Sequence, residues 1–409
     1  MRSIPPPDFF LLTSSYEGYF MEFSDRISRI SVSSTAAVVQ KAEKLRATGA
    51  KLVDFGAGEP DFPTPDHIKQ AAVRALEENF TKYTPTGGTR DLREALIERH
   101  AKDFGSSYTL EECLATPGGK QAIFEAVMAT INPGDEVILP VPYWVSFLDI
   151  INYAGGKAVF LDTHEAEDFA VRAEAVEKLI TPRTRMIIIN SPNNPTGAAL
   201  SREEMERLLA LAVRHKILLM SDECYCHFVY DDPPFSLGSS KDRDHLLIVG
   251  SLSKTYAMTG WRVGFALGSA KLLSNMLKLQ SHSTSNPTSI AQKAAVEALR
   301  ASQDSVRAML AEYRRRRDRV VEGLRSIPRV TCTLPQGAFY AYPNISAYLS
   351  PDGLADTTVL AERLLDEAHV AVVPGPAFGT QQHVRLSYAT SLDHIDEGIK
   401  RMKAFFAKL

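Results

Sequence analysis

The middle of the chain alternates short apolar runs rich in β-branched residues with stretches of helical periodicity. The runs that predict strands are Glu136–Leu139, Ala158–Leu161, Met186–Asn190, Ile217–Ser221, Leu246–Gly250 and Val263–Leu267. Helical patterns such as Arg202–Arg214 fall between several of these runs. Short, continuously apolar strands separated by helices are typical of a mostly parallel sheet with helices on both faces. We therefore expect an α/β fold.

Helical patterns also flank this region. On its N-terminal side they are Asp66–Leu76, Asp91–Ala101 and a run from Gly118 to Met128. On its C-terminal side we expect a long charged helix at Asp304–Leu324, a strand at Gly337–Tyr342, a helix near Thr358–Glu367 and a closing helix from Leu392. The regular alternation of strands and helices ends here, which predicts a second, smaller α+β domain.

The chain length of 409 residues also predicts more than one domain, because a single core rarely exceeds roughly 250–300 residues. We expect a large cofactor-binding domain at 66–303, with its mostly parallel sheet sandwiched by helices. Residues 304–409 would form the small domain, completed by an N-terminal arm at 21–65. Residues 1–20 do not match a secretory signal, and we interpret them as a disordered or non-native extension with Met21 as the natural start.

Charge and composition exclude several classes of partner. The net charge is −3, from 46 Lys and Arg against 49 Asp and Glu. The chain therefore lacks the excess of positive charge that is typical of proteins that bind nucleic acid or an anionic membrane. No apolar stretch is long enough to span a membrane. We interpret the basic run Arg314–Arg317 as the solvent-exposed face of the long helix.

The cysteines predict neither disulfides nor a metal site. Four cysteines in a chain of this length do not form a disulfide framework, and scattered thiols fit a cytoplasmic protein. Cys224, Cys226 and His227 lie together, but no second ligand pair follows at zinc-finger spacing.

Unusual polar residues follow three strands that are successive in the sequence. They are Asn194, then Asp222 with Tyr225, then Lys254. Ligands of parallel α/β sheets bind beyond the carboxyl ends of the strands. The sequence therefore predicts that one edge of the sheet gathers these four side chains into a site.

Pyridoxal phosphate (PLP), a pyridine aldehyde, requires such a set. A lysine, here Lys254, must attack the aldehyde to form a Schiff base. A carboxylate, here Asp222, must keep the ring nitrogen protonated so that the ring accepts electrons from a substrate carbanion. Asn194 and Tyr225 can steady the phenolate oxygen of the ring.

The phosphate of PLP has its own candidate residues. The amides of Gly119 and Lys120 lie at a helix start, which favours anions. Ser251, Ser253 and Arg262 add hydroxyls and a guanidinium.

Each of these signals has an ordinary explanation by itself. Asp222 alone would more often cap a helix or bind magnesium. Ser251-Leu252-Ser253-Lys254 also fits the serine nucleophile of a β-lactamase-like enzyme, although the other motifs of that class are missing. Gly118-Gly119-Lys120 resembles a truncated P-loop. The shared order and the shared sheet edge favour one PLP site.

From about Ser24 to its C-terminus, the chain resembles the fold-type I PLP-dependent aminotransferases, in particular the class I aspartate and aromatic branch. The blocks that carry the resemblance are Gly56–Pro60, Tyr83–Pro85, Ser191–Gly197, Asp222–Tyr225, Ser251–Arg262 and Val384–Tyr388. The resemblance implies a ping-pong transfer of an amino group from an L-amino acid to a 2-oxo acid. Lys254 would be both the Schiff-base lysine and the proton shuttle.

The resemblance also assigns roles outside the strand ends. Trp144 would stack on the pyridine ring, with core packing as the alternative. Arg385 would clamp the substrate α-carboxylate, helped by Asn194 and the backbone at Gly58, with a structural salt bridge as its alternative. Tyr83 would reach the phosphate of the neighbouring subunit's cofactor, which implies a homodimer with shared active sites. Simple loop packing is the other explanation for Tyr83.

The substrate is less well determined. The positions aligned with the distal-carboxylate residues of aspartate enzymes are Ser281 and Ser31, with Arg29 nearby as a substitute. An aspartate-type reaction with 2-oxoglutarate ranks first, ahead of an aromatic, prephenate or broad-specificity aminotransferase. A PLP-dependent lyase is the competing enzyme class. A non-catalytic PLP-binding regulator ranks last, because little chain precedes Gln40 to form a DNA-binding unit.

Overall fold

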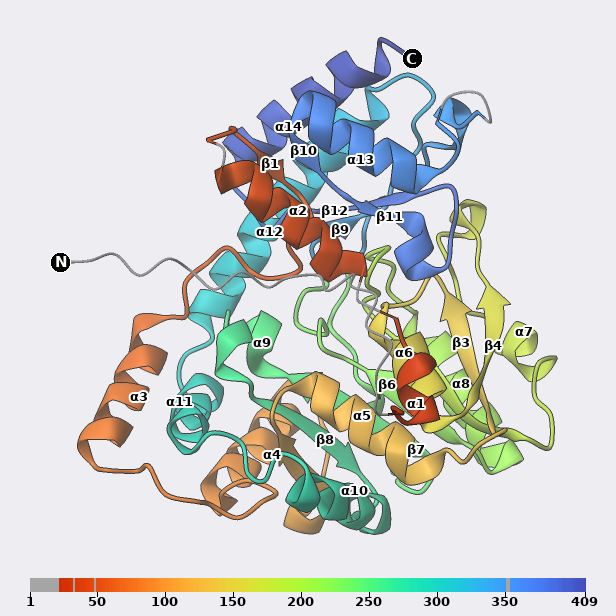
Figure 1. The fold of residues 1–409 in the computed structure, drawn as a ribbon. Coiled ribbons are helices and arrows are strands. Elements are labelled where there is room, and N and C mark those ends of the chain that lie inside the picture. The colour runs from red at the N-terminus through yellow and green to blue at the C-terminus, as the bar shows by residue number, and fades with distance from the viewer. Residues whose placement is uncertain (1–21, 32–33, 48, 351–353) are drawn as a thin grey trace.

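The computed structural model describes residues 22–31, 34–47, 49–350 and 354–409 (Figure 1). The predicted extension at 1–20 and the predicted start at Met21 lie outside these residues.

A seven-stranded sheet forms the centre of the larger half of the molecule. Its strands, in spatial order, are β2 (Cys113–Thr116), β8 (Gly264–Gly268), β7 (Leu246–Ser251), β6 (Leu218–Asp222), β5 (Thr184–Asn190), β3 (Glu136–Val141) and β4 (Lys157–Asp162). β8 is antiparallel to both of its neighbours, and the other adjacent pairs are parallel. The prediction of a mostly parallel sheet is confirmed. The predicted strands match within a few residues, whereas β2 was not predicted.

Helices cover both faces of this sheet (Figure 1). One face shares a core with α3 (Asp66–Glu77), α4 (Arg90–Phe104), α7 (Ala173–Glu177), α8 (Arg202–His215) and α11 (Ser289–Arg300). The other face packs against α5 (Gly119–Thr130), α6 (Ser146–Ala154) and α10 (Ala270–His282). Successive residues of a strand point to opposite faces, so Ile187 belongs to the first core and Ile188 to the second. Burial on both faces explains why the strands are continuously apolar.

The C-terminal part packs around a further core, which also includes β1 near the N-terminus and residues from the segments after β6 and β7. Its elements are α12 (Asp304–Arg325), β9 (Tyr340–Ala341), α13 (Thr357–Ala368), β10 (Val370–Ala371), β11 (Val373–Pro374), β12 (Val384–Ser387) and α14 (Leu392–Phe406). β1 (Val53–Asp54) pairs in parallel with β10, and β9, β12 and β11 form an antiparallel sheet. The predicted strand at Gly337–Tyr342 is correct in place, but the strand itself comprises only Tyr340 and Ala341, and Gly337 forms an isolated bridge with Val229. Two further helices, α1 (Asp25–Ser28) and α2 (Ser34–Ala47), precede β1.

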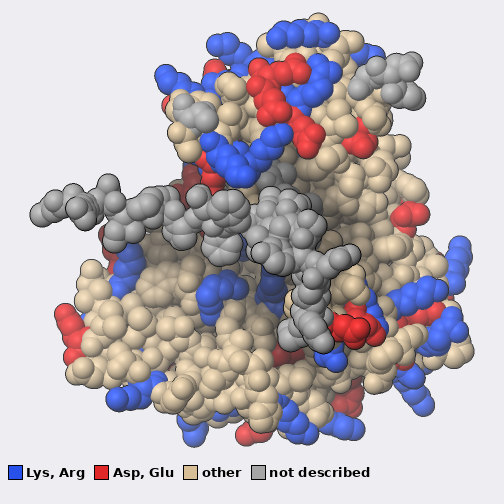
Figure 2. All heavy atoms as spheres, viewed as in Figure 1, with Lys and Arg blue, Asp and Glu red and all other residues tan. Residues whose placement is uncertain are grey.

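The prediction for the basic run on α12 is wrong for half of its residues. Arg314 and Arg315 are exposed, as predicted. Arg316 and Arg317 are buried, at 6% and 3% exposure, and each pairs with two carboxylates. A helix turns about 100° per residue, so four consecutive arginines cannot all face solvent when the helix packs on one side. Elsewhere on the visible surface, basic and acidic side chains are interspersed (Figure 2).

Candidate active site

A cavity of about 650 Å³ lies between the carboxyl ends of β5, β6 and β7 and the C-terminal part. In Figure 2, basic side chains lie in the hollow between the two halves of the molecule. The predicted site residues that line the cavity are Gly58, Gly119, Lys120, Trp144, Asn194, Asp222, Tyr225, Ser251, Ser253, Lys254, Arg262 and Arg385. The structure therefore brings together every predicted site residue except Tyr83.

Lys254 points its amine into this cavity. It lies in α9 (Leu252–Thr255), a single turn capped by Ser251, which accepts a hydrogen bond from the amide of Ser253. The Lys254 ammonium donates to the carbonyl of Gly58. Burial lowers the pKa of Lys254 to about 8, although the nearby Cys224 and Glu59 act in the opposite direction. A lysine with this pKa has a much larger neutral fraction near pH 7 than an ordinary lysine, and the neutral amine is the nucleophile.

Asp222 ends β6 and is 4% exposed. Its carboxylate accepts a hydrogen bond from the amide of Cys224 at 3.1 Å. Burial raises the pKa of Asp222 to about 6. In the described part of the chain no cation pairs with it. A buried carboxylate of this kind suits a ligand that brings a positively charged N–H group.

Tyr225 and Asn194 reach the cavity from neighbouring segments. The Tyr225 hydroxyl lies 2.8 Å from that of Tyr340, and burial raises the pKa of Tyr225 well above its usual value. Tyr225 therefore stays protonated and can donate a hydrogen bond. The amide of Asn194 donates to the side chain of Asn190 at 2.8 Å, which fixes the turn after β5.

Arg385 is a buried guanidinium without a carboxylate partner among the described residues. It is 3% exposed, and burial lowers its pKa. Nη1 donates to Oδ1 of Asn194 at 3.0 Å and Nη2 to the carbonyl of Gly56 at 2.8 Å, while Nε has no partner in the described chain. The group lies 4.6 Å from the ring centre of Tyr340. A desolvated cation with only neutral partners has capacity for an incoming carboxylate.

At the start of α5, the backbone amides and the guanidinium of Arg262 lie close together. We call this group the cradle. Gly118 has a φ of +92°, and a Cβ at this position would lie 2.4 Å from Nη2 of Arg262. A Cβ at Gly264 would lie 2.2 Å from the amide nitrogen of Gly119. Only glycines permit this close approach. The Ser251 hydroxyl donates to that of Ser253 at 2.9 Å. Amides at a helix start, hydroxyls and a guanidinium fit a phosphate.

Lys120 and Trp144 form a further part of the cavity wall. The Lys120 ammonium lies 5.0 Å from the ring centre of Trp144. Burial, together with the charge of Arg262, lowers the pKa of Lys120. No carboxylate of the described chain pairs with this ammonium. Lys120 was predicted for its amide alone, so its side chain is an additional cation of the site.

Four residues considered for substrate or cofactor contacts lie outside the cavity. Tyr83 is 91% exposed. Ser31 bonds to Asp149 of α6, and the Ser281 hydroxyl donates to the carbonyl of Lys278 within α10. The Arg29 side chain lies beside Gly155 at the end of α6.

Several cavity residues were missed by the sequence argument, among them Tyr340, Asn190 and Cys224. Tyr340 lies in a strand whose aromatic residues have the pattern of a core, and most of them are indeed core. Asn190 ends a predicted strand, and Cys224 lies between Asp222 and Tyr225. The position of both next to predicted residues was the available signal.

Two further features concern the whole described chain. All four cysteines are free. In the residues that the structure describes, no helix is long and apolar enough to cross a membrane, and no cluster of His, Cys, Asp or Glu could hold a metal ion.

Known proteins match this chain over nearly its full length. A family model described as aminotransferase class I and II matches residues 50–402. The aspartate/prephenate aminotransferase of Thermus thermophilus is 45% identical over 382 residues, which cover 92% of this chain and 97% of that protein. The aspartate aminotransferase of Bacillus subtilis is 39% identical over 391 residues, covering 95% and 100%. A solved structure, the aspartate aminotransferase from Thermus thermophilus with maleate, has a TM-score of 0.89 at 44% identity, covering 94% and 100%.

Proposed function

Because this chain belongs to the family of class I and II aminotransferases, we propose that it moves the α-amino group of an L-amino acid, preferably aspartate, to a 2-oxo acid such as 2-oxoglutarate. PLP would be the cofactor. One observation carries the proposal: the buried Arg385, which has no carboxylate partner among the described residues, lies in the same cavity as Lys254. An amine and a guanidinium that binds anions are what amino-group transfer between acids requires.

The cradle at α5 would hold the cofactor phosphate. The donors are the amides of Gly119 and Lys120, the hydroxyls of Ser251 and Ser253, and the guanidinium of Arg262. These groups supply positive charge and fixed hydrogen bonds at one end of the cavity.

At the other end, Asp222 would accept a hydrogen bond from the ring nitrogen, while Tyr225 and Asn194 would donate to the phenolate oxygen. Bound PLP supplies an electron sink, a protonated ring that accepts the electron pair left on the substrate α-carbon. Asp222 suits this chemistry because its buried carboxylate lacks a cation. Trp144 would pack against the ring face.

Lys254 would hold the cofactor covalently at rest and act as the general base during turnover. Its pKa of about 8 makes the neutral amine far more accessible near neutral pH than in an ordinary lysine, so that it can take the proton from the substrate α-carbon and return it later. Arg385 would orient the substrate by its α-carboxylate.

The distal carboxylate of a dicarboxylic substrate needs a second cation, and we assign this role to the side chain of Lys120. Of the cavity cations, Arg262 is engaged in the phosphate cradle, Arg385 by the α-carboxylate and Lys254 in the chemistry. Lys120 remains without a carboxylate in the described chain. The relatives named aspartate aminotransferases, one of them solved with the dicarboxylate maleate, support a dicarboxylic substrate. Prephenate or aromatic substrates are the alternative, supported by the relatives named aspartate/prephenate aminotransferases.

A homodimer and a cytoplasmic location complete the proposal. Tyr83, an aromatic residue that is 91% exposed in the single chain, supports a subunit contact at that loop and would reach the partner subunit's cofactor phosphate. Four free cysteines are consistent with a reducing compartment.

The test is Lys254→Ala in protein loaded with PLP, with Lys271→Ala on the exposed surface of α10 as the control. We expect turnover of aspartate with 2-oxoglutarate to fall at least about a thousandfold, because the nucleophile and base are lost together. Borohydride should fix PLP to the wild type and to the control but not to Lys254→Ala. Near wild-type turnover by Lys254→Ala would refute the mechanism. Release of ammonia and a 2-oxo acid without amino-group transfer would indicate a lyase instead.

A further inference from the structure

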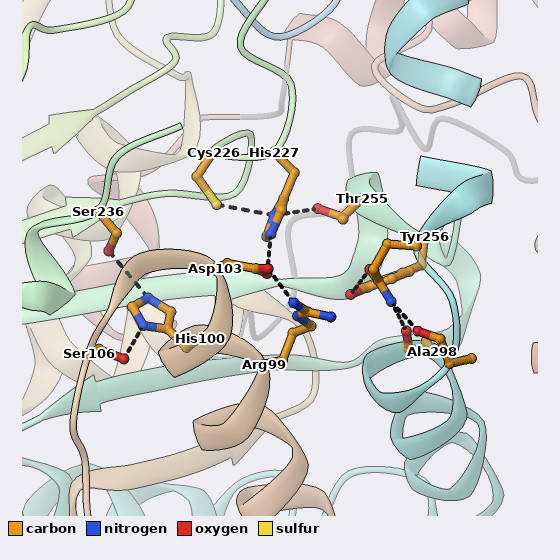
Figure 3. A network of polar contacts seen from close by, with 12 residues as sticks. Arg99, His100, Asp103, Ser106, Cys226, His227, Ser236, Thr255, Tyr256 and Ala298 are labelled. Carbon is orange, nitrogen blue, oxygen red and sulfur yellow. Dashed lines mark hydrogen bonds and ion pairs between the residues drawn. The ribbon is translucent and has the colours of Figure 1, made fainter. Parts of the chain in front are cut away.

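A partly buried polar cluster lies behind the cavity wall, where α4 packs against the segments that carry Tyr225 and Lys254 (Figure 3). We name it the His227 cluster; it consists of His227, Asp103 and Thr255. Ser251 borders both the main cavity and the small internal space beside this cluster. The three residues of the cluster do not line the main cavity themselves.

The ring of His227 connects three segments of the chain. Nε2 lies 3.0 Å from Oδ2 of Asp103 on α4. Nδ1 lies 3.4 Å from the hydroxyl of Thr255, the residue after Lys254, and 3.3 Å from the sulfur of Cys226. Asp103 is fixed in turn by an ion pair with Arg99. One ring therefore joins a 15-residue helix to the segments that carry Tyr225 and Lys254.

Neither of those segments is stiff by itself. Lys254 lies in a helix of only four residues, and residues 224–227 form turns. A single helical turn is marginally stable without tertiary contacts. α4, in contrast, is long and buries Leu92, Ala95 and Leu96 in the core. The relative placement of Lys254 and Tyr225 thus depends on contacts with elements such as α4.

We propose that His227, held by Asp103, is a positioning residue that fixes Lys254 and Tyr225 relative to each other for PLP binding. It acts through Thr255 and the turn after Tyr225, without touching cofactor or substrate. The inference rests on the proposed function, since it concerns the same cofactor site.

The charges of the cluster support this role. Burial alone would lower the pKa of His227, but the neighbouring Cys226 and the Asp103 carboxylate reverse the effect and raise it to about 10. The Asp103 carboxylate thus favours the protonated ring, in which both nitrogens can donate. Asp103 stays ionised, since hydrogen bonds from His227 and Arg99 outweigh burial and lower its pKa.

His100, which lies on α4 like Asp103, provides a matched control for His227. It is buried more fully than His227, and its ring bonds to the hydroxyls of Ser106 at 2.7 Å and Ser236 at 3.2 Å. Burial lowers the pKa of His100 to about 3, so it is neutral. Its partners do not line the main cavity. Replacing His100 removes a buried ring of equal size without releasing the segment of Lys254.

The experiment compares His227→Gln, Thr255→Val and His100→Gln in the full-length protein. Glutamine can still reach Asp103 from position 227 but cannot also reach Thr255. Each cofactor-free protein is titrated with PLP by visible absorbance, its thermal unfolding is recorded, and kcat and KM are measured after saturation with PLP. We expect His227→Gln to weaken PLP binding and lower kcat about tenfold each, with KM for the amino acid within about twofold because Arg385 is untouched. His100→Gln should lose thermal stability but keep its PLP affinity.

Thr255→Val removes only one hydroxyl, so it keeps the test valid if His227→Gln does not fold. We expect it to weaken PLP binding about threefold to fivefold, and the double variant to be no weaker than His227→Gln alone. Unchanged PLP affinity in both variants, or equal losses in His227→Gln and His100→Gln, would overturn the positioning role. Wild-type protein that binds no PLP would overturn the proposed function as well, which distinguishes the two failures.

Discussion

Two regions of this molecule bury arginine side chains, and they differ in what surrounds the charge. On α12, Arg316 meets Asp61 and Glu312 at 2.8 and 2.9 Å, and Arg317 meets Asp231 and Asp318 at 2.7 and 2.8 Å. On β12, Arg385 is equally buried but has only neutral partners in the described chain. Arg316 and Arg317 join elements of the fold. The charge of Arg385 is available to a ligand.

The physical basis of this difference is the cost of removing a charge from water. A buried ion is retained when partners compensate for its lost hydration. For Arg316 and Arg317 the compensation is already present in the folded chain. For Arg385 and Asp222 it would come only with substrate and cofactor. A buried charge without a counterion is therefore a better indicator of the site than burial or charge alone.

Arg385→Met should give the largest effect on activity. We expect kcat/KM for aspartate to fall about a thousandfold, because a bidentate contact to the α-carboxylate is lost. Thermal stability without ligand should stay equal or increase, since an uncompensated buried cation is removed. Steady-state kinetics and thermal unfolding of the ligand-free protein measure the two effects. Marked destabilisation would mean that Arg385 is a structural residue.

Arg317→Met should give the opposite pattern. We expect unfolding to become easier by about 2–3 kcal/mol, at the low end for a buried pair because the side chains of Asp231 and Asp318 are about half exposed. Activity at saturating PLP should stay within about twofold. Chemical denaturation with urea provides the free energy of unfolding. A fall in kcat/KM well beyond twofold, with the free energy of unfolding unchanged, would remove the distinction between the two regions.

The sequence allowed much of this comparison to be predicted, but not the pairing of the charges. Parallel strands and their polar carboxyl ends follow from local pattern, and so Asn194, Asp222 and Lys254 were placed at one sheet edge. Whether Arg316 faces water or Asp61 depends on a contact between residues 255 positions apart, which no local pattern encodes. Tyr340 was missed for the same reason, since a site tyrosine and a core tyrosine look identical in a strand.

Lys120→Met tests the cavity cation that has neither a carboxylate partner in the described chain nor another role in the proposal. We expect the preference for aspartate over a neutral amino acid, as a ratio of kcat/KM values, to fall about tenfold, because the partly exposed ammonium contributes less than a fully buried one. PLP affinity should change little, since the phosphate contact at this position uses the backbone amide. Half-reaction rates for aspartate and alanine measure the ratio. An unchanged ratio would assign the distal carboxylate to another residue.

The smallest effect concerns the pH dependence of PLP capture by cofactor-free protein. Burial lowers the pKa of Lys254 from 10.5 to about 8, and only the neutral amine attacks an aldehyde. The capture rate should therefore rise with pH and level off above about 8, whereas an ordinary lysine would show a rise continuing past pH 10. Glu59 stabilises the charged amine, so Glu59→Gln should move the midpoint to lower pH, and Glu111→Gln, on the exposed surface, should not. Stopped-flow absorbance across this pH range measures the midpoint. A midpoint near 10 would mean that the cavity does not desolvate Lys254, and that its amine is no more reactive than those on the surface.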